Sequence, residues 1–97
     1  SSKKKYMKIP SSFTLGATTW RVKIVDDLPD RMGQADFRNA TILLEKNSNK
    51  QIMAQTFCHE LLHSLFFSTG RVDDHDEVLI DGLSHSLHQY LVEIYKD

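Results

Sequence analysis

The sequence predicts a small α+β domain in which an antiparallel or mixed sheet of three to four strands packs on two helices. Three observations support this class. Apolar and polar residues alternate in short segments of the first half of the chain. Apolar residues recur at helical spacing in the second half. The length of 97 residues, with 40% hydrophobic and 26% charged residues, suits one globular core. We therefore expect a single domain over residues 9–97, preceded by a flexible basic tail over residues 1–8.

Two β-hairpins are expected in the first half. The first runs from Phe13 to Val25, with a turn near Gly16 and Ala17 and a second strand that alternates apolar and charged residues. Residues 26–30, with the sequence DDLPD, have the composition of a loop. The second hairpin is predicted to consist of strands Gln34–Phe37 and Ala40–Leu44, joined through Arg38 and Asn39.

Two helices should follow the strands. Ser48, with Gln51 three residues later, fits the capping box that begins a helix. Apolar residues then recur at helical spacing to about Ser68, and the helix should stop near Gly70. The second helix is expected to start at Asp73 or Asp74, to end near Tyr95 and to bury Ile80, Leu83, Leu87, Leu91 and Ile94.

The stretch TFCHELLHSL, residues 56–65, contains the pattern His-Glu-x-x-His. Because residues four apart lie one turn above each other on a helix, the rings of His59 and His63 project the same way and can both reach one metal ion. Glu60 lies about 100° around the helix from His59 and about 60° from His63. It is therefore near enough to touch a metal-bound water as a general base.

The surroundings of this pattern favour a metal centre over an ordinary buried helix. Burying two imidazoles and a carboxylate beside Phe57 and Leu61 without partners would cost several kcal/mol. Zinc satisfies such groups, because it takes two neutral imidazoles and a carboxylate and leaves a fourth position for water. Because Cys58 is the only cysteine, an intrachain disulfide and a Cys-rich zinc finger are both excluded. Cys58 itself is expected to be a packed thiol.

A third ligand is expected from the second helix. Glu77 follows His63 after a loop long enough to fold the second helix back across the first. Asp81 lies one turn further on the same face, where its carboxylate can accept the free N–H of a metal-bound imidazole. Three other acidic residues at the start of this helix are alternative ligands, although their position favours capping: Asp73, Asp74 and Asp76.

These residues carry a resemblance to a known family. His59-Glu60-x-x-His63 followed by Glu77-x-x-x-Asp81 resembles the gluzincin metallopeptidases. The wider chain, from IPSSFTLGATTWRVKIV through GQADFRNATILL to LSHSLHQYL, is similar to small phage-associated proteins related to the ImmA/IrrE-type peptidases and the minigluzincins. The resemblance implies a zincin-like minimal domain, in which the sheet packs on the HExxH helix and on a C-terminal helix that carries the glutamate.

The resemblance also implies a role for each residue. It implies one Zn²⁺ ion held by His59, His63 and Glu77, with Glu60 as the base and Asp81 supporting His59. It further implies that the strand Gly33–Phe37 is an edge along which an extended substrate lies. The backbone groups expected to pair with such a peptide belong to Gln34, Ala35 and Asp36.

The expected reaction is hydrolysis of a peptide bond by a zinc-bound water that Glu60 deprotonates. The sequence singles out no donor for the developing oxyanion. His85 lies on the stripe of Glu77 and Asp81 and is a candidate, with a structural role as its alternative. Further candidates are His75, Tyr90 and Tyr95, whereas His88 is expected to be a partly exposed helix residue.

The substrate is expected to be a protein or peptide, such as a repressor or another regulator. The alternative function is a non-catalytic, zinc-stabilised protein-binding module, which a fourth protein ligand on the metal would indicate. A net charge of −1 provides no basic field for nucleic acid, so direct DNA binding is not expected. Nothing approaches about 18 consecutive apolar residues, so no membrane span is expected. A cytoplasmic setting follows, in a bacterial host cell if the protein is phage-associated.

Overall fold

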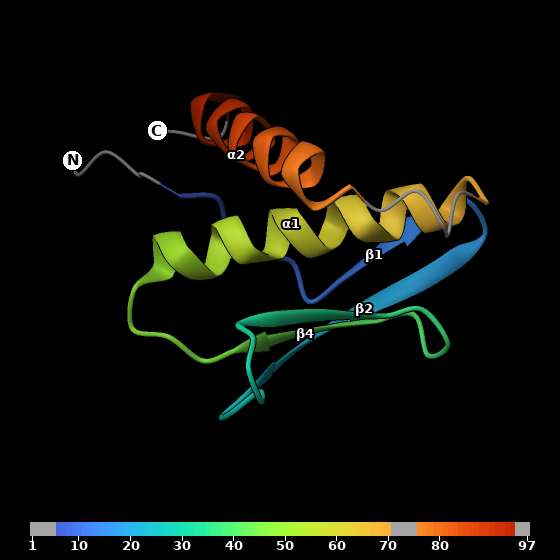
Figure 1. Cartoon of the computed structure of the whole chain (residues 1–97), viewed down its shortest axis with the longest axis horizontal. Coiled ribbons are helices and arrows are strands. Elements are labelled where there is room, and N and C mark those ends of the chain that lie inside the picture. Colours follow the sequence, from blue (N-terminus) through green and yellow to red (C-terminus); the bar gives the residue numbers. More distant parts are fainter. Residues whose placement is uncertain (1–5, 71–75, 95–97) are drawn as a thin grey trace.

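The computed structural model describes residues 6–70 and 76–94 and has the predicted α+β class (Figure 1). A mixed sheet of four strands is followed by two helices. Neither helix in the described part of the chain has the length and apolar character needed to cross a membrane. The elements are β1 (Ser12–Leu15), β2 (Thr18–Val25), β3 (Gly33–Asp36), β4 (Thr41–Glu45), α1 (Lys50–Ser68) and α2 (Glu77–Ile94).

The strand order in the sheet is β1-β2-β4-β3. β1 and β2 form the predicted antiparallel hairpin, whose turn contains Gly16 in the left-handed conformation (φ 59°). β2 pairs with β4 in parallel, and β3 pairs with β4 in antiparallel orientation. As a result, β3 lies at one edge of the sheet, as the resemblance implied for Gly33–Phe37.

The second hairpin has a longer turn than predicted. Its strands are separated by residues 37–40, rather than by Arg38 and Asn39 alone. The carboxylate of Asp36 accepts hydrogen bonds from the backbone N–H of Asn39 (3.2 Å) and from its side-chain amide (2.8 Å). Ala40 then takes a left-handed conformation (φ 48°), and β4 begins one residue later than expected.

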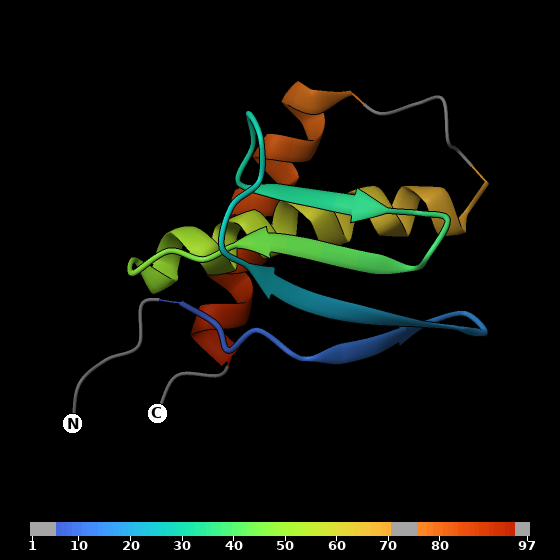
Figure 2. The ribbon, with the colours of Figure 1, turned by 90° about the horizontal axis from the view of Figure 1, so that it is seen from below.

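The elements form three layers (Figures 1 and 2). α1 covers one face of the sheet, and α2 crosses α1 on the side away from the sheet. Trp20 is buried on the face that meets α1, while its neighbour Arg21 is exposed. The core therefore sits between the sheet and α1, and its buried residues are Trp20, Ile42, Leu44, Phe57 and Cys58.

Both ends of α1 are fixed by side-chain and backbone hydrogen bonds. The predicted cap at Ser48 is wrong by one residue, because the side chain of Asn49 accepts from the N–H of Ile52 at 3.1 Å. At the other end, Gly70 adopts φ 84° and its N–H donates to the carbonyl of Phe67 at 2.9 Å. The predicted stop near Gly70 is confirmed.

α2 begins at Glu77, and Asp76 caps it. The Oδ1 atom of Asp76 accepts from the N–H groups of Val78 (3.0 Å) and Leu79 (3.1 Å). Asp76 is thus engaged in capping, which leaves Glu77 in the first turn to face α1. The predicted boundaries of this helix, Asp73, Asp74 and Tyr95, lie outside the described residues.

The inner face of α2 differs in part from the prediction. Ile80 is fully buried, and Leu87 and Leu91 pack against the core. Leu83 and Ile94, which were expected inside, are exposed, because the helix turns Ser84 and His88 inward instead. The buried residues are therefore Ile80, Ser84 and His88, which follow one another at four-residue intervals.

The N-terminal segment also contributes to the packing. Met7, assigned from the sequence to the basic tail, packs against the core, and its sulfur lies 3.5 Å from the Cys58 thiol. The packed part of the chain therefore begins before Ile9. Residues 1–5, which carry most of the predicted tail, lie outside the described residues.

Candidate metal centre

α1 presents the two predicted histidines on the side that faces α2. The ring centroids of His59 and His63 are 5.0 Å apart, as expected for residues one helical turn apart. Their side chains are 21% and 11% exposed, respectively, so each ring is held mostly within the protein. Such confinement fixes the direction in which the ring nitrogens point.

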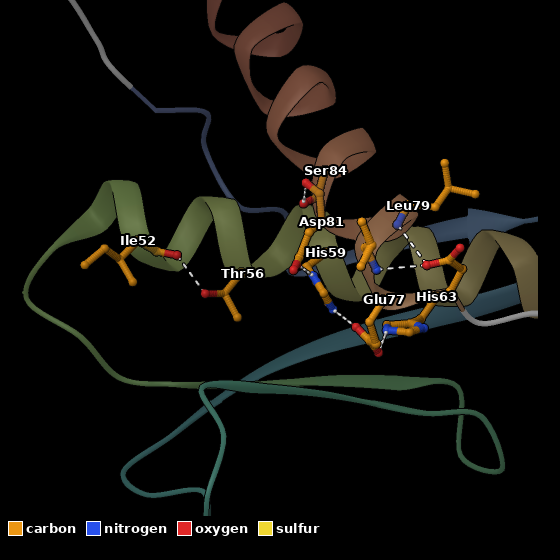
Figure 3. A network of polar contacts seen from close by, with 10 residues as sticks. Ile52, Thr56, His59, His63, Glu77, Leu79, Asp81 and Ser84 are labelled. Carbon is orange, nitrogen blue, oxygen red and sulfur yellow. Dashed lines mark hydrogen bonds and ion pairs between the residues drawn. The ribbon is translucent and has the colours of Figure 1, made fainter.

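Glu77 brings one carboxylate to both rings (Figure 3). Its Oε2 atom lies 3.1 Å from Nε2 of His59, and its Oε1 atom lies 3.0 Å from Nε2 of His63. One ligand atom from each of the three residues lies within 4.8 Å of the other two. The cluster of His59, His63 and Glu77 could therefore hold a metal ion, with two imidazole nitrogens and a carboxylate oxygen as ligands.

Asp81 fixes the orientation of His59 from behind. Its Oδ1 atom lies 2.8 Å from Nδ1 of His59, on the opposite side of the ring from Glu77 (Figure 3). A proton held on Nδ1 by this carboxylate leaves the Nε2 lone pair available for a metal. The four-residue spacing of Glu77 and Asp81 on α2 thus lets both carboxylates reach the same imidazole.

Glu60 lies beside this cluster in a more enclosed position. It is only 8% exposed, and the backbone N–H of Ala35 in β3 donates a hydrogen bond to its carboxylate. Burial raises the pKa of Glu60 above its ordinary value, and the nearby charge of Glu77 raises it further. His59, the Arg31 guanidinium and the Ala35 N–H oppose this rise. A carboxylate with an elevated pKa next to a metal cluster is suited to proton transfer.

Gly33 makes the close approach of β3 to Glu60 possible. A Cβ atom at this position would lie 2.6 Å from Cγ2 of Thr56 and 3.1 Å from Cγ of Glu60. A side chain at this position would force Thr56 or β3 to shift. In the sequence-based prediction, Gly33 is only the first residue of the edge strand Gly33–Phe37. The available signal was a glycine opening an otherwise ordinary strand pattern, which often marks a close backbone approach.

A cleft of about 770 Å³ surrounds the cluster. β3 and the loop before it form one wall, α1 forms the floor, and the first turns of α2 form the other wall. The lining of this cleft includes His59, His63 and Glu77 as well as the predicted base, Glu60. Gln34 and Ala35 line it as well, so the edge strand and the metal cluster face the same space.

The register of β3 shows which backbone groups face away from the sheet. The carbonyl of Met32 accepts from the N–H of Glu45 in β4 at 2.9 Å, so it points toward β4. Because backbone groups alternate in direction along a strand, those of Gln34 and Asp36 also face β4, and those of Gly33 and Ala35 face outward. Of the three predicted peptide-pairing residues, only Ala35 therefore has outward backbone groups. Its N–H is engaged with Glu60, so the group that it offers to a peptide is its carbonyl. Gly33, which was not among the three, also has outward backbone groups.

The remaining candidates for an oxyanion donor are placed unequally. His85 lines the cleft one turn beyond Asp81 on α2. Tyr90 is exposed and does not line the cleft. His75 and Tyr95 lie outside the described residues.

Two other sequence predictions concern groups away from the cluster. The expectation that His88 is partly exposed is wrong: it is 3% exposed, and its Nε2 atom has no hydrogen-bond partner in the part of the chain that the structure describes. Burial, together with the nearby His85, lowers the pKa of His88. The prediction that Cys58 is a packed thiol is confirmed, and burial raises its pKa to about 12.

Comparison of the chain with protein-family models, with curated protein sequences and with solved structures finds no match. What the centre can do is therefore inferred from its own residues. These residues offer two imidazoles, a bridging carboxylate and a buried acid in one cleft. Such a set can bind a cation and transfer a proton beside it.

Proposed function

We propose that this protein is a zinc-dependent metallopeptidase of the gluzincin type. The observation that carries the proposal is the convergence of His59 Nε2 and His63 Nε2 on the Glu77 carboxylate, with Asp81 behind His59. Two imidazoles and one carboxylate are the protein ligands of many catalytic zinc sites, which keep a further position for water or substrate. The three layers of the fold are compatible with the zincin-like minimal domain that the sequence resembles.

The protein residues divide the chemistry among them. His59, His63 and Glu77 would hold the zinc ion, which when bound supplies a Lewis acid that polarises a carbonyl group and acidifies water. Glu60 takes a proton from the attacking water and delivers it to the leaving nitrogen. Asp81 keeps His59 in the tautomer that ligates through Nε2. The enclosure of Glu60 supports this role, because its raised pKa makes the captured proton easier to hold until the bond breaks.

An extended peptide is the substrate that best suits this cleft. The outward backbone groups of Gly33 and the outward carbonyl of Ala35 can pair with a peptide lying along the free edge of β3. Main-chain pairing of this kind carries little information about side chains, so it suits a protein or peptide substrate in general. A repressor or another regulator as the natural substrate stays a prediction.

A non-catalytic, zinc-stabilised binding module is the second candidate function. It is favoured by the openness of the cleft, since the side chains of Glu77 and Asp81 are 62% and 63% exposed. A small wall around the site excludes little water and so supports slow catalysis at best. Against the module, the cluster found among residues 6–70 and 76–94 contains three ligand residues rather than the four of a closed structural site.

The proposal is tested by measuring zinc content and peptide cleavage on the same samples. Zinc-loaded wild type and the Glu60→Gln variant are incubated with a mixed peptide library, and products are identified by mass spectrometry. We expect Glu60→Gln to keep one zinc per chain and to lose cleavage by at least about 100-fold. Asp27→Asn, an exposed carboxylate outside the cleft, is the matched control and should behave like wild type. Undiminished cleavage by Glu60→Gln would remove it from the role of base, and zinc-loaded wild type without any cleavage would favour the module.

A further inference from the structure

One cation in the cleft is not used by the proposed chemistry. Arg31 lines the cleft immediately before β3 and is the only arginine or lysine among the described lining residues. Its side chain is exposed, and no ion pair involves it within residues 6–70 and 76–94. By contrast, the carboxylates of Glu77 and Asp81 already face imidazoles. Arg31 is therefore a permanent positive charge that is available to a ligand.

The position of Arg31 relative to the metal cluster follows from the direction of β3. Gly33, at the start of β3, lies against Thr56 and Glu60 of α1. Phe37, just after the end of β3, stacks on Phe67 near the end of α1, with ring centroids 4.6 Å apart. β3 and α1 therefore run in the same direction (Figure 2). Arg31 lies beyond Glu60 at the beginning of the strand, and its charge acts on that carboxylate.

The direction of the substrate in the cleft follows from the proposed function, on which this inference rests. Glu60 delivers a proton to the leaving nitrogen, so the nitrogen must lie on the Glu60 side of the cluster. The leaving nitrogen begins the C-terminal half of the cleaved peptide. This half must extend past Gly33 toward Arg31, and the peptide must run antiparallel to β3. That direction allows antiparallel pairing with the outward backbone groups of Gly33 and the outward carbonyl of Ala35.

We propose that Arg31 binds a carboxylate on the C-terminal half of the substrate and so makes the enzyme selective for acidic peptides. A strand advances about 3.3 Å per residue, which places the preferred carboxylate about two to four residues beyond the scissile bond. Either an Asp or Glu side chain or the terminal carboxylate of the peptide supplies this group. The planar guanidinium matches both, because it donates two parallel hydrogen bonds to a carboxylate.

The experiment uses matched fluorogenic peptides of one sequence. One series carries Asp or Asn at each of the second to fourth positions after the scissile bond. A second series ends at these positions with a free carboxylate or an amide. We expect kcat/KM to be about fivefold higher for the carboxylate form, the size of one solvent-exposed ion pair. Arg31→Ala should abolish this preference, Arg31→Lys should keep part of it, and added salt should weaken it.

Two neighbouring residues provide controls. Arg38→Ala removes an exposed arginine at the opposite end of β3, outside the cleft lining, and should leave the preference unchanged. Asp30→Asn removes the carboxylate next to Arg31 in the cleft and should strengthen the preference. A response confined to the first or second peptide series identifies the side-chain or the terminal carboxylate as the source.

Failure of this inference can be told apart from failure of the proposed function. Cleavage of all peptides with no carboxylate preference, or a preference that survives Arg31→Ala, overturns the role of Arg31 and leaves the peptidase intact. If no peptide is cleaved, binding of the same peptides to zinc-loaded Glu60→Gln is measured by fluorescence anisotropy. An Arg31-dependent preference in binding supports the inference without catalysis, and its absence overturns the inference.

Discussion

Replacing Gly33 with alanine tests how closely β3 approaches α1 beside the candidate base. The new Cβ would meet Thr56 Cγ2 at 2.6 Å, a separation that real Cβ contacts essentially never show, and Glu60 Cγ at 3.1 Å. Overpacking of this kind costs about 1–3 kcal/mol. Alanine also restricts the unfolded chain more than glycine does, and this effect stabilises the folded state by about 0.4–1 kcal/mol. The variant should therefore be less stable than wild type by about 1–2 kcal/mol.

The clash can be assigned to one methyl group by a double-mutant cycle. Thr56→Ser removes Cγ2, and we expect the cost of Gly33→Ala to fall by at least about 1 kcal/mol in this background. Urea unfolding followed by circular dichroism gives the four free energies of unfolding. Gly82→Ala is the matched control, because a Cβ at Gly82, in the middle of α2, meets nothing within 4 Å. The free energy of unfolding of this control should exceed that of wild type by about 0.5–1 kcal/mol.

A Gly33→Ala variant as stable as wild type would mean that β3 does not lie against Thr56 and Glu60 as described. A cost that Thr56→Ser fails to relieve would mean that the strain lies elsewhere. Either outcome would also weaken the evidence that Glu60 faces β3. The proposed path of the substrate depends on this orientation.

Three further predictions concern Asp81, His88 and Cys58. Asp81→Ala should weaken zinc affinity by about 10–100-fold, because His59 loses the partner on its Nδ1. The affinity is measured by competition with a chromophoric chelator, and an unchanged value would remove Asp81 from this role. Burial, with His85 nearby, lowers the pKa of His88 in the folded chain. As the pH falls below 6.5, the unfolded chain therefore binds a proton at His88 before the folded chain does, and the folded state loses stability. Urea unfolding at pH 7.5 and 5.5 should show a smaller loss of stability for His88→Leu than for wild type, and equal losses would contradict the lowered pKa of His88. Burial raises the pKa of Cys58 to about 12. At pH 8 a thiol reagent should therefore react with the folded chain about a thousandfold more slowly than with the urea-unfolded chain. Comparable rates would place the thiol at the surface.

The features that depend on local sequence were the predictable ones. Alternation of apolar and charged residues predicted β2 and the burial of Trp20, but Ile24, which was expected on the same face, is 55% exposed. The His59–His63 spacing predicted that both rings lie on one side of a helix, as they do. The four-residue step from Glu77 to Asp81 likewise predicted two carboxylates on one face. Periodicity determines such relations within one element without knowledge of its neighbours.

The features that depend on packing between elements were not predictable. His88 was expected to be a partly exposed helix residue, but it continues the buried stripe of Ile80 and Ser84 at four-residue steps. The contact between Gly33 and Glu60 and the place of Arg31 in the cleft require the approach of β3 to α1, which no single segment encodes. The cap of α1 fell on Asn49 instead of Ser48, since adjacent polar residues compete for the same position.

The central claim is that His59, His63 and Glu77 together hold one zinc ion with a position left for water. X-ray absorption spectroscopy of the zinc-loaded protein tests it most directly. We expect one zinc per chain with a shell of nitrogen and oxygen ligands at about 2.0–2.2 Å, two imidazoles and no sulfur. The Glu77→Gln variant should lose zinc affinity while keeping its fold. A chain that binds no zinc, or a shell with fewer than two imidazoles, would contradict the account.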